Sequence, residues 1–281
     1  MKIALITAIL LISLSCYAQK PNLIYLWPGN VPGENKGKAE PVLAESRGDN
    51  VTRIAEITNP AIEVFPADPS NSNGAGVIVC PGGAYSYLAY NKEGTEIARW
   101  LNSLGYSAFV LSYRVPDNRK GALQDAMRAI RIVKENSRRW NIDPGKIGIM
   151  GFSAGGSLSA RTSTRYNQRT YTTVDRADSL SARPSFALLI YPAYLDEGPD
   201  HTLSTELTIT PDTPPVFIFQ TADDPYGNSA LVMAGALRDA GIPVEVHIIA
   251  EGGHGYGLRK GNPSAETWPG FAEHWLGNII K

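Results

Sequence analysis

The stretch KIGIMGFSAGGSLSA, residues 146–160, places a serine between glycines where an apolar run gives way to small and polar residues. The apolar run predicts a buried strand, and the residues after the glycines predict the start of a helix. Residues 151–155 match the pattern G-x-S-x-G, in which a sharp strand-to-helix turn lifts the serine hydroxyl out of the sheet. Ser153 is therefore a candidate nucleophile, and the simpler alternative is a tight turn that happens to contain a serine.

The chain around this turn alternates short apolar strands with amphipathic helices. This alternation predicts the α/β class, with a mostly parallel central sheet covered by helices on both faces. In such sheets the chemistry lies at the carboxyl ends of the strands. Strands are predicted at residues 52–58, 61–67, 76–81, 107–113, 146–150, 186–192, 216–220 and 244–250, and helices at 95–105, 121–140, from 156 onward, 229–241 and 264–280. We expect Pro269 to disturb the last of these helices.

The length and charge of the chain limit the classes of function. The chain has 281 residues, of which 43% are hydrophobic, and its formal net charge is −1. This balance argues against nucleic acid or an anionic membrane surface as a partner. We expect a single domain over residues 19–281, in which the Pro- and Gly-rich residues 19–50 form an irregular arm.

The first twenty residues, MKIALITAILLISLSCYAQK, resemble an export signal. A lysine precedes an apolar run that ends in small residues, which predicts a signal peptide over residues 1–18, cleaved after Ala18. The run is too short for a stable transmembrane span, so we expect a secreted or periplasmic protein. The less favoured alternative is a lipoprotein anchored at Cys16.

A serine nucleophile needs a base, and one of the four histidines follows a strand in a flexible loop. His254 lies in EGGHGYGL, residues 251–258, four residues beyond the last apolar strand. Loops on a rigid scaffold often carry function, and the flanking glycines would let this imidazole approach Ser153. His247 lies inside a predicted strand, where packing is the more common role.

The base in turn needs a carboxylate that fixes its tautomer. TADDP, residues 221–225, offers Asp223 and Asp224 just past the preceding strand. Adjacent side chains point in different directions, so one of the two can reach His254. The residue spacing does not settle which of the two acts; we favour Asp223 and keep Asp224 as the alternate acid, with Asp196 as an outside candidate.

An ester-cleaving serine also needs donors for the oxyanion that forms during attack. One donor is the backbone N–H of Ala154, the residue after the nucleophile. The loop in VIVCPGGAY, residues 77–85, would supply the other, because Gly82 and Gly83 allow the backbone to approach closely. The simpler alternative for this loop is an ordinary Pro-Gly turn.

These motifs, together with YRVPDN at residues 113–118, resemble a known family. Over roughly residues 23–280 the chain is similar to secreted bacterial esterases of the α/β-hydrolase fold, of the acetylxylan esterase-like or xylanase-associated type. The resemblance implies Ser153 as nucleophile, His254 as base and Asp223 as acid, with Gly83 and Ala154 in the oxyanion hole. The chain departs from the family in a shorter loop after TADDP and in Pro81, where many esterases have histidine.

The resemblance implies a serine carboxylester hydrolase that removes short acyl groups, often acetyl, from plant polysaccharide without a cofactor. We expect an acylated carbohydrate as the substrate and no metal, since the sequence has no metal-ligand spacing. A peptidase of the prolyl-oligopeptidase type and an inactive hydrolase-fold binding protein are the alternatives. Four tyrosines near the motifs are either a platform for sugar rings or parts of the core: Tyr85, Tyr87, Tyr90 and Tyr256.

Overall fold

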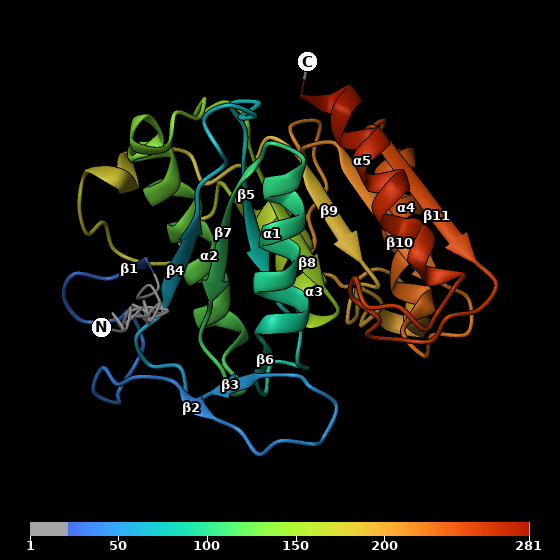
Figure 1. The fold of residues 1–281 in the computed structure, drawn as a ribbon, viewed down its shortest axis with the longest axis horizontal. Coiled ribbons are helices and arrows are strands. Elements are labelled where there is room, and N and C mark those ends of the chain that lie inside the picture. The colour runs from blue at the N-terminus through green and yellow to red at the C-terminus, as the bar shows by residue number, and fades with distance from the viewer. Residues whose placement is uncertain (1–21, 281) are drawn as a thin grey trace, which may run out of the picture.

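The computed structural model describes residues 22–280, so the predicted signal peptide, its cleavage after Ala18 and the alternative anchor at Cys16 lie outside the described residues. An eight-stranded sheet runs through the described chain (Figure 1). The strand order is β1-β4-β7-β5-β8-β9-β10-β11. The last six strands of this order, from β7 to β11, pair in parallel, whereas β4 pairs antiparallel with β7 and β1 antiparallel with β4.

The parallel strands are apolar along their length because both faces of the sheet are covered. In β5, Ile78 packs into one core cluster, whereas Val77 and Val79 pack into the other, as the two-residue period of a strand requires. The strands of the sheet are β1 Leu23–Tyr25, β4 Ala61–Phe65, β5 Gly76–Cys80, β7 Ser107–Ser112, β8 Ile147–Phe152, β9 Ala187–Ile190, β10 Val216–Thr221 and β11 Val244–Ile249.

Helices cover both faces of the sheet. On one face, α1 (Glu96–Ser103) and α5 (Trp268–Ile279) contribute to the cluster that contains Val77. On the other face, α2 (Arg119–Glu135), α3 (Ala154–Arg165) and α4 (Gly227–Asp239) contribute to the second cluster. In Figure 1, α1 and α5 lie in front of the sheet. The predicted fold class, a mostly parallel α/β sheet with helices on both faces, is therefore confirmed.

Two helix boundaries differ from the sequence-based expectation. The second helix begins after Asn118, whose side chain accepts a hydrogen bond from the Gly121 N–H, and it ends at Glu135 before a 3-10 turn at Ser137–Trp140. Pro269 does not interrupt the last helix but lies in the first turn of α5. Proline is tolerated at that position because the first N–H groups of a helix have no intrahelical acceptor.

Residues 22–50 contain two short strands, and the rest of this segment forms turns and irregular structure. β1 extends the edge of the main sheet, and β2 (Val42–Leu43) pairs with β3 (Arg53–Ala55), which in turn pairs with β6 (Leu88–Ala89). This small sheet lies below the main sheet in Figure 1, on the side toward which the arrows of β9 and β11 point. Within residues 22–280, no helix combines the length and apolar character needed to cross a membrane.

Candidate active site

Ser153 occupies a sharp turn between β8 and α3. Its backbone has φ 52° and ψ −119°, a conformation that non-glycine residues rarely adopt. A Cβ atom at Gly151 would lie 2.0 Å from the carbonyl oxygen of Gly155, and one at Gly155 would lie 2.0 Å from the carbonyl oxygen of Cys80. The two glycines of the motif are therefore required by close backbone contacts, and the predicted strand–turn–helix context is present.

The imidazole of His254 bridges the serine and a carboxylate. Its Nε2 lies 2.8 Å from the Ser153 Oγ, and its Nδ1 lies 2.6 Å from Oδ2 of Asp224. The Asp224 side chain is fully buried, whereas a quarter of the His254 side chain is exposed. An imidazole held in this way can take a proton from the serine and return it to a leaving group.

The carboxylate in contact with the imidazole belongs to Asp224. The sequence-based choice of Asp223 as the orienting acid is therefore wrong. Asp223 points away from the imidazole and accepts hydrogen bonds from the N–H groups of Gly252 and Gly253 at 3.1 and 2.9 Å. These backbone donors lower the pKa of the Asp223 carboxyl. Asp223 thus holds the backbone of the loop that carries His254, while its neighbour contacts the ring.

The glycine loop after β5 lies against the serine turn. A Cβ atom at Gly82 would lie 2.9 Å from the Cβ of Ser153. The Gly82 N–H donates to the carboxyl of Glu93 at 2.8 Å, so its expected place among the oxyanion donors is wrong. Within residues 22–280, the N–H groups of Gly83 and Ala154 have no protein acceptor, which leaves both available to a bound ligand.

The serine and the imidazole open into a cavity of about 220 Å³. Of the four tyrosines noted in the sequence, Tyr87 lines this cavity, and Tyr85 and Tyr256 are buried in the core instead. Two further tyrosines line the cavity: Tyr194, which follows β9, and Tyr226, which follows β10. No sequence motif indicated either of them. Charged residues of the lining are Asp49, Arg53, Lys92 and Glu93.

Among residues 22–280, no group of three His, Cys, Asp or Glu side chains is arranged to hold a metal ion. His247 lies within β11 and contacts Glu245 at 2.8 Å, away from the serine. Asp196 accepts hydrogen bonds from Asn228 and Ser229, so this outside candidate for the acid fixes the start of α4. The structure therefore brings together Ser153, His254 and Asp224, and it places the other candidates elsewhere.

Comparison with solved structures identifies the family. The chain is similar to an acetyl ester-xyloside bifunctional hydrolase from Caldicellulosiruptor lactoaceticus, with 32% sequence identity and a TM-score of 0.74. The match covers 94% of this chain and 98% of that chain. The chain belongs to the acetylxylan esterase-like family of α/β-hydrolases.

Two curated relatives agree with this family, and residues 64–191 match the protein family described as BD-FAE. An acetylxylan esterase of Xylanibacter ruminicola is 32% identical over 242 residues, which are 76% of this chain and 46% of that protein. Endo-1,4-beta-xylanase B of Butyrivibrio fibrisolvens is 34% identical over 206 residues, which are 64% of this chain and 32% of that protein. The chain thus spans less than half the length of either curated relative.

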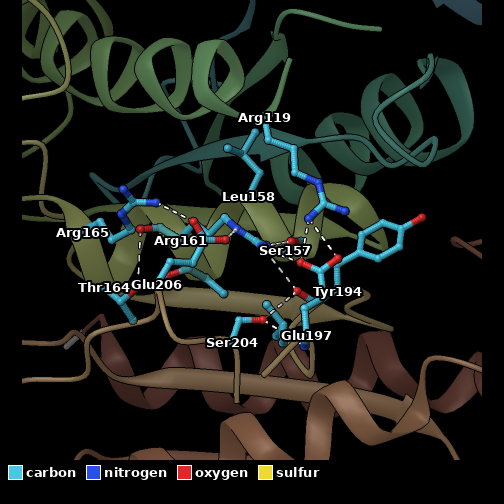
Figure 2. Close-up of polar contacts among 12 residues, drawn as sticks. Arg119, Ser157, Leu158, Arg161, Thr164, Arg165, Tyr194, Glu197, Ser204 and Glu206 are labelled. Atoms are coloured by element: carbon cyan, nitrogen blue, oxygen red, sulfur yellow. Dashed lines mark hydrogen bonds and ion pairs between the residues drawn. The ribbon is translucent and has the colours of Figure 1, made fainter. Parts of the chain in front are cut away.

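In this acetylxylan esterase-like chain, a buried arginine holds the loop that brings Tyr194 to the cavity. Figure 2 shows Arg161 of α3 in contact with Ser157, one turn earlier in the helix, and with two loop carboxylates. Its Nε donates to Glu206 at 2.5 Å, and its Nη2 donates to Glu197 at 3.3 Å and to the Tyr194 carbonyl oxygen at 3.2 Å. The helix that begins at the serine therefore also fixes one wall of the cavity.

The Tyr194 ring is held from a second side by Arg119, which also appears in Figure 2. The Arg119 guanidinium lies 4.8 Å from the centre of the Tyr194 ring and pairs with Glu197 at 2.7 Å. Tyr226 packs against the Tyr194 ring at 5.3 Å and against the His254 ring at 5.0 Å. The two tyrosines thus form a continuous aromatic wall beside the imidazole.

Proposed function

We propose that this chain is a serine carboxylic ester hydrolase that removes acetyl or other short acyl groups from xylan-type carbohydrate. The single observation that carries the proposal is the position of the His254 ring. Its Nε2 lies 2.8 Å from the Ser153 Oγ, and its Nδ1 lies 2.6 Å from the Asp224 Oδ2. This arrangement supplies a nucleophile, a base and an orienting carboxylate in the chain order of α/β-hydrolases.

The proposed reaction proceeds through an acyl-enzyme. The Ser153 Oγ attacks the ester carbonyl carbon while the His254 Nε2 takes its proton, and Asp224 stabilises the imidazolium. The N–H groups of Gly83 and Ala154 stabilise the negative charge on the tetrahedral oxygen. The intermediate collapses, His254 returns the proton to the leaving alcohol, and water releases the acid by the same sequence of steps. None of these steps uses a cofactor.

The substrate class is proposed from the proteins to which this chain is similar and from the size of the cavity. An acetylxylan esterase and an acetyl ester-xyloside hydrolase are among the proteins to which this chain is similar. A cavity of about 220 Å³ lies below the usual range for drug-sized ligands, which supports a short acyl group. The polar residues Asp49 and Arg53 in the lining of the cavity are suited to a hydroxyl-rich leaving group.

The proposal is tested by comparing wild type with Ser153→Ala on p-nitrophenyl acetate, butyrate and octanoate, and then on acetylated xylan. Wild type is expected to prefer acetate, and Ser153→Ala is expected to lose at least about 10⁴-fold in kcat because the nucleophile is gone. Ser163→Ala is the matched control, since it removes another buried hydroxyl of α3 that has no partner among the described residues.

Three outcomes would contradict parts of this proposal. Activity of Ser153→Ala within tenfold of wild type would exclude Ser153 as the nucleophile. Equal activity on octanoate and acetate would exclude the preference for short acyl groups. Cleavage of proline-containing dipeptide amides faster than of any ester would favour the peptidase alternative instead.

We also propose that residues 1–18 direct export and are removed after Ala18. The proposal rests on the lysine, the apolar run and the small residues of the sequence. N-terminal sequencing of the mature protein from its native host tests it. A terminus at Gln19 is expected, whereas a lipid-modified terminus at Cys16 would show that the chain is a lipoprotein.

A further inference from the structure

Glu93 is a buried carboxyl group beside the proposed catalytic residues that the reaction does not use. It lies in the π-helical turn Asn91–Thr95 before α1, lines the same cavity as Ser153, and is 4% exposed. Burial raises the pKa of the Glu93 carboxyl, and hydrogen bonds from Tyr191 and Gly82 oppose this rise. A carboxyl group is unfavourable in a buried position unless its oxygens have partners, so its contacts are informative.

The two oxygens of Glu93 contact two different parts of the site. Oε2 accepts the backbone N–H of Gly82 at 2.8 Å, and Oε1 accepts the hydroxyl of Tyr191 at 2.8 Å. The Tyr191 hydroxyl also accepts the N–H of Gly257 at 3.1 Å. Gly257 lies three residues after His254, so a continuous line of hydrogen bonds joins the glycine loop to the histidine loop.

The contact with Gly82 determines which N–H of the glycine loop faces the cavity. Because Glu93 occupies the Gly82 N–H, the next residue, Gly83, is left as the donor from this loop. The loop lies close against the serine turn, since a Cβ at Gly82 would lie 2.6 Å from the Phe152 carbonyl oxygen and 2.9 Å from the Ser153 Cβ.

The contact between Glu93 and Tyr191 reaches the loop that carries His254. The Tyr191 backbone has φ 38°, its side chain is fully buried, and its ring lies 5.1 Å from the His254 ring with an edge-to-face orientation. The hydroxyl that meets Glu93 therefore fixes both the Tyr191 ring and the backbone at Gly257. A residue that holds two loops at once can set the distance between the oxyanion donors and the base.

We propose that Glu93 is a positioning residue for ester hydrolysis, which holds the Gly83 N–H in the oxyanion hole and, through Tyr191, holds the loop of His254. The inference rests on the proposed function, because the oxyanion hole matters only if Ser153 attacks an ester. It assigns to Glu93 no contact with substrate and no proton transfer.

The test compares Glu93→Gln with wild type in kcat and KM for p-nitrophenyl acetate. The glutamine keeps the size of the side chain, but only its amide oxygen can accept, so it satisfies at most one of the two donors that Glu93 accepts. We expect kcat to fall about 10- to 100-fold with KM within about twofold of wild type, because misplaced oxyanion donors affect the transition state more than the bound ester.

Glu63→Gln is the matched control. Glu63 accepts the Tyr90 hydroxyl at 2.5 Å, so it also forms a carboxyl–tyrosine contact, yet it contacts neither the glycine loop nor the histidine loop. We expect kcat of this variant to stay within about twofold of wild type. Tyr191→Phe, which removes only the hydroxyl, is expected to lower kcat by less than Glu93→Gln, and the effects in the double variant are expected not to add.

The fraction of active protein is measured with an organophosphonate, whose tetrahedral phosphorus mimics the oxyanion intermediate. If Glu93 positions the donors, the rate of inactivation falls in parallel with kcat while the thermal melting temperature stays near that of wild type. An unchanged kcat per active site, or a rise in KM alone, would overturn the inference. If Glu93→Gln does not fold, Tyr191→Phe decides: lower kcat at constant KM supports the inference, and unchanged kcat overturns it.

These outcomes are distinct from failure of the proposed function. If Ser153→Ala keeps the wild-type ester activity, the function is wrong whatever Glu93 does. If Ser153→Ala is inactive and Glu93→Gln matches wild type per active site, the function stands and the positioning role is wrong.

Discussion

Two loops bring buried carboxyl groups to the site, and they use them differently. The loop after β10 supplies Asp224, whose oxygen meets the His254 ring at 2.6 Å. The loop after β5 and its following turn supply Glu93, whose oxygens meet a backbone N–H and a tyrosine hydroxyl. The first carboxyl contacts the side chain of the proposed base, and the second contacts a backbone N–H and a tyrosine beside it.

The comparison teaches that hydrogen-bond partners, rather than residue type, distinguish these carboxyl groups. Asp223 shows the same division within one loop, because it holds the N–H groups of Gly252 and Gly253 while its neighbour Asp224 contacts the ring. A carboxyl group bound to backbone donors is expected to affect geometry and stability, whereas one bound to the imidazole is expected to affect the rate directly.

The largest expected difference is in kcat, between the variants Asp224→Asn and Asp223→Asn. Asp224→Asn should lower kcat by about 10³- to 10⁴-fold, because the amide favours the wrong tautomer of His254. Asp223→Asn should lower kcat by less than about tenfold, since the amide oxygen still accepts from one loop N–H. Kinetics on p-nitrophenyl acetate measure both, and a larger loss for Asp223→Asn would reverse the assignment.

A second comparison concerns the wall of the cavity that Arg161 supports. Replacing this buried side chain by methionine removes its contacts with Ser157, Glu197, Glu206 and the Tyr194 carbonyl oxygen. We expect Arg161→Met to lower the free energy of unfolding by about 2–4 kcal/mol, as losses of buried polar networks do. Urea denaturation measures this change.

The control for Arg161→Met is Arg165→Met on the same helix. Arg165 also pairs with Glu206, at 2.7 Å, but its side chain is 23% exposed. A partly exposed ion pair contributes little, so we expect a loss of no more than about 1 kcal/mol. Equal losses of unfolding free energy in the two variants would show that burial does not determine how much Arg161 contributes to stability.

The smallest effect is expected from removing the hydroxyl of Tyr194. Burial raises the pKa of this hydroxyl to about 12, so it stays neutral throughout the working range of an esterase. Tyr194→Phe keeps the ring that Arg119 and Tyr226 contact. We therefore expect kcat/KM within about threefold of wild type and an unchanged pH profile between about pH 6 and 9. A shifted profile would show that the hydroxyl takes part in the chemistry.

The sequence predicted the parts of this site that depend on local backbone geometry. Ser153 and His254 stand out because glycines surround each of them just past a predicted strand. Asp224 could not be separated from its neighbour, because the choice depends on the direction in which each side chain leaves the turn. Gly82 was placed among the oxyanion donors because nothing in the sequence indicates that a residue eleven positions later, Glu93, takes its N–H.

The fold was predicted with similar limits. Apolar periodicity located the six parallel strands and the helices that cover them, since burial on both faces leaves a strong pattern. The pattern did not reveal β1, β2 and β6, which have two or three residues each and owe their pairing to neighbours distant in the chain. Tyr194 was missed for a related reason, because its approach to the cavity depends on how Arg161 and Arg119 hold the loop after β9. Tyr226, after β10, was missed because its packing on the Tyr194 ring joins two distant loops.

The most direct test of the central claim is to locate the covalent adduct formed by an organophosphonate. We predict that peptide mass spectrometry of the inactivated protein finds the adduct on Ser153, and that His254→Ala and Asp224→Asn slow its formation while Asp223→Asn changes it little. An adduct on another residue, or equal rates of labelling in wild type and His254→Ala, would contradict the account.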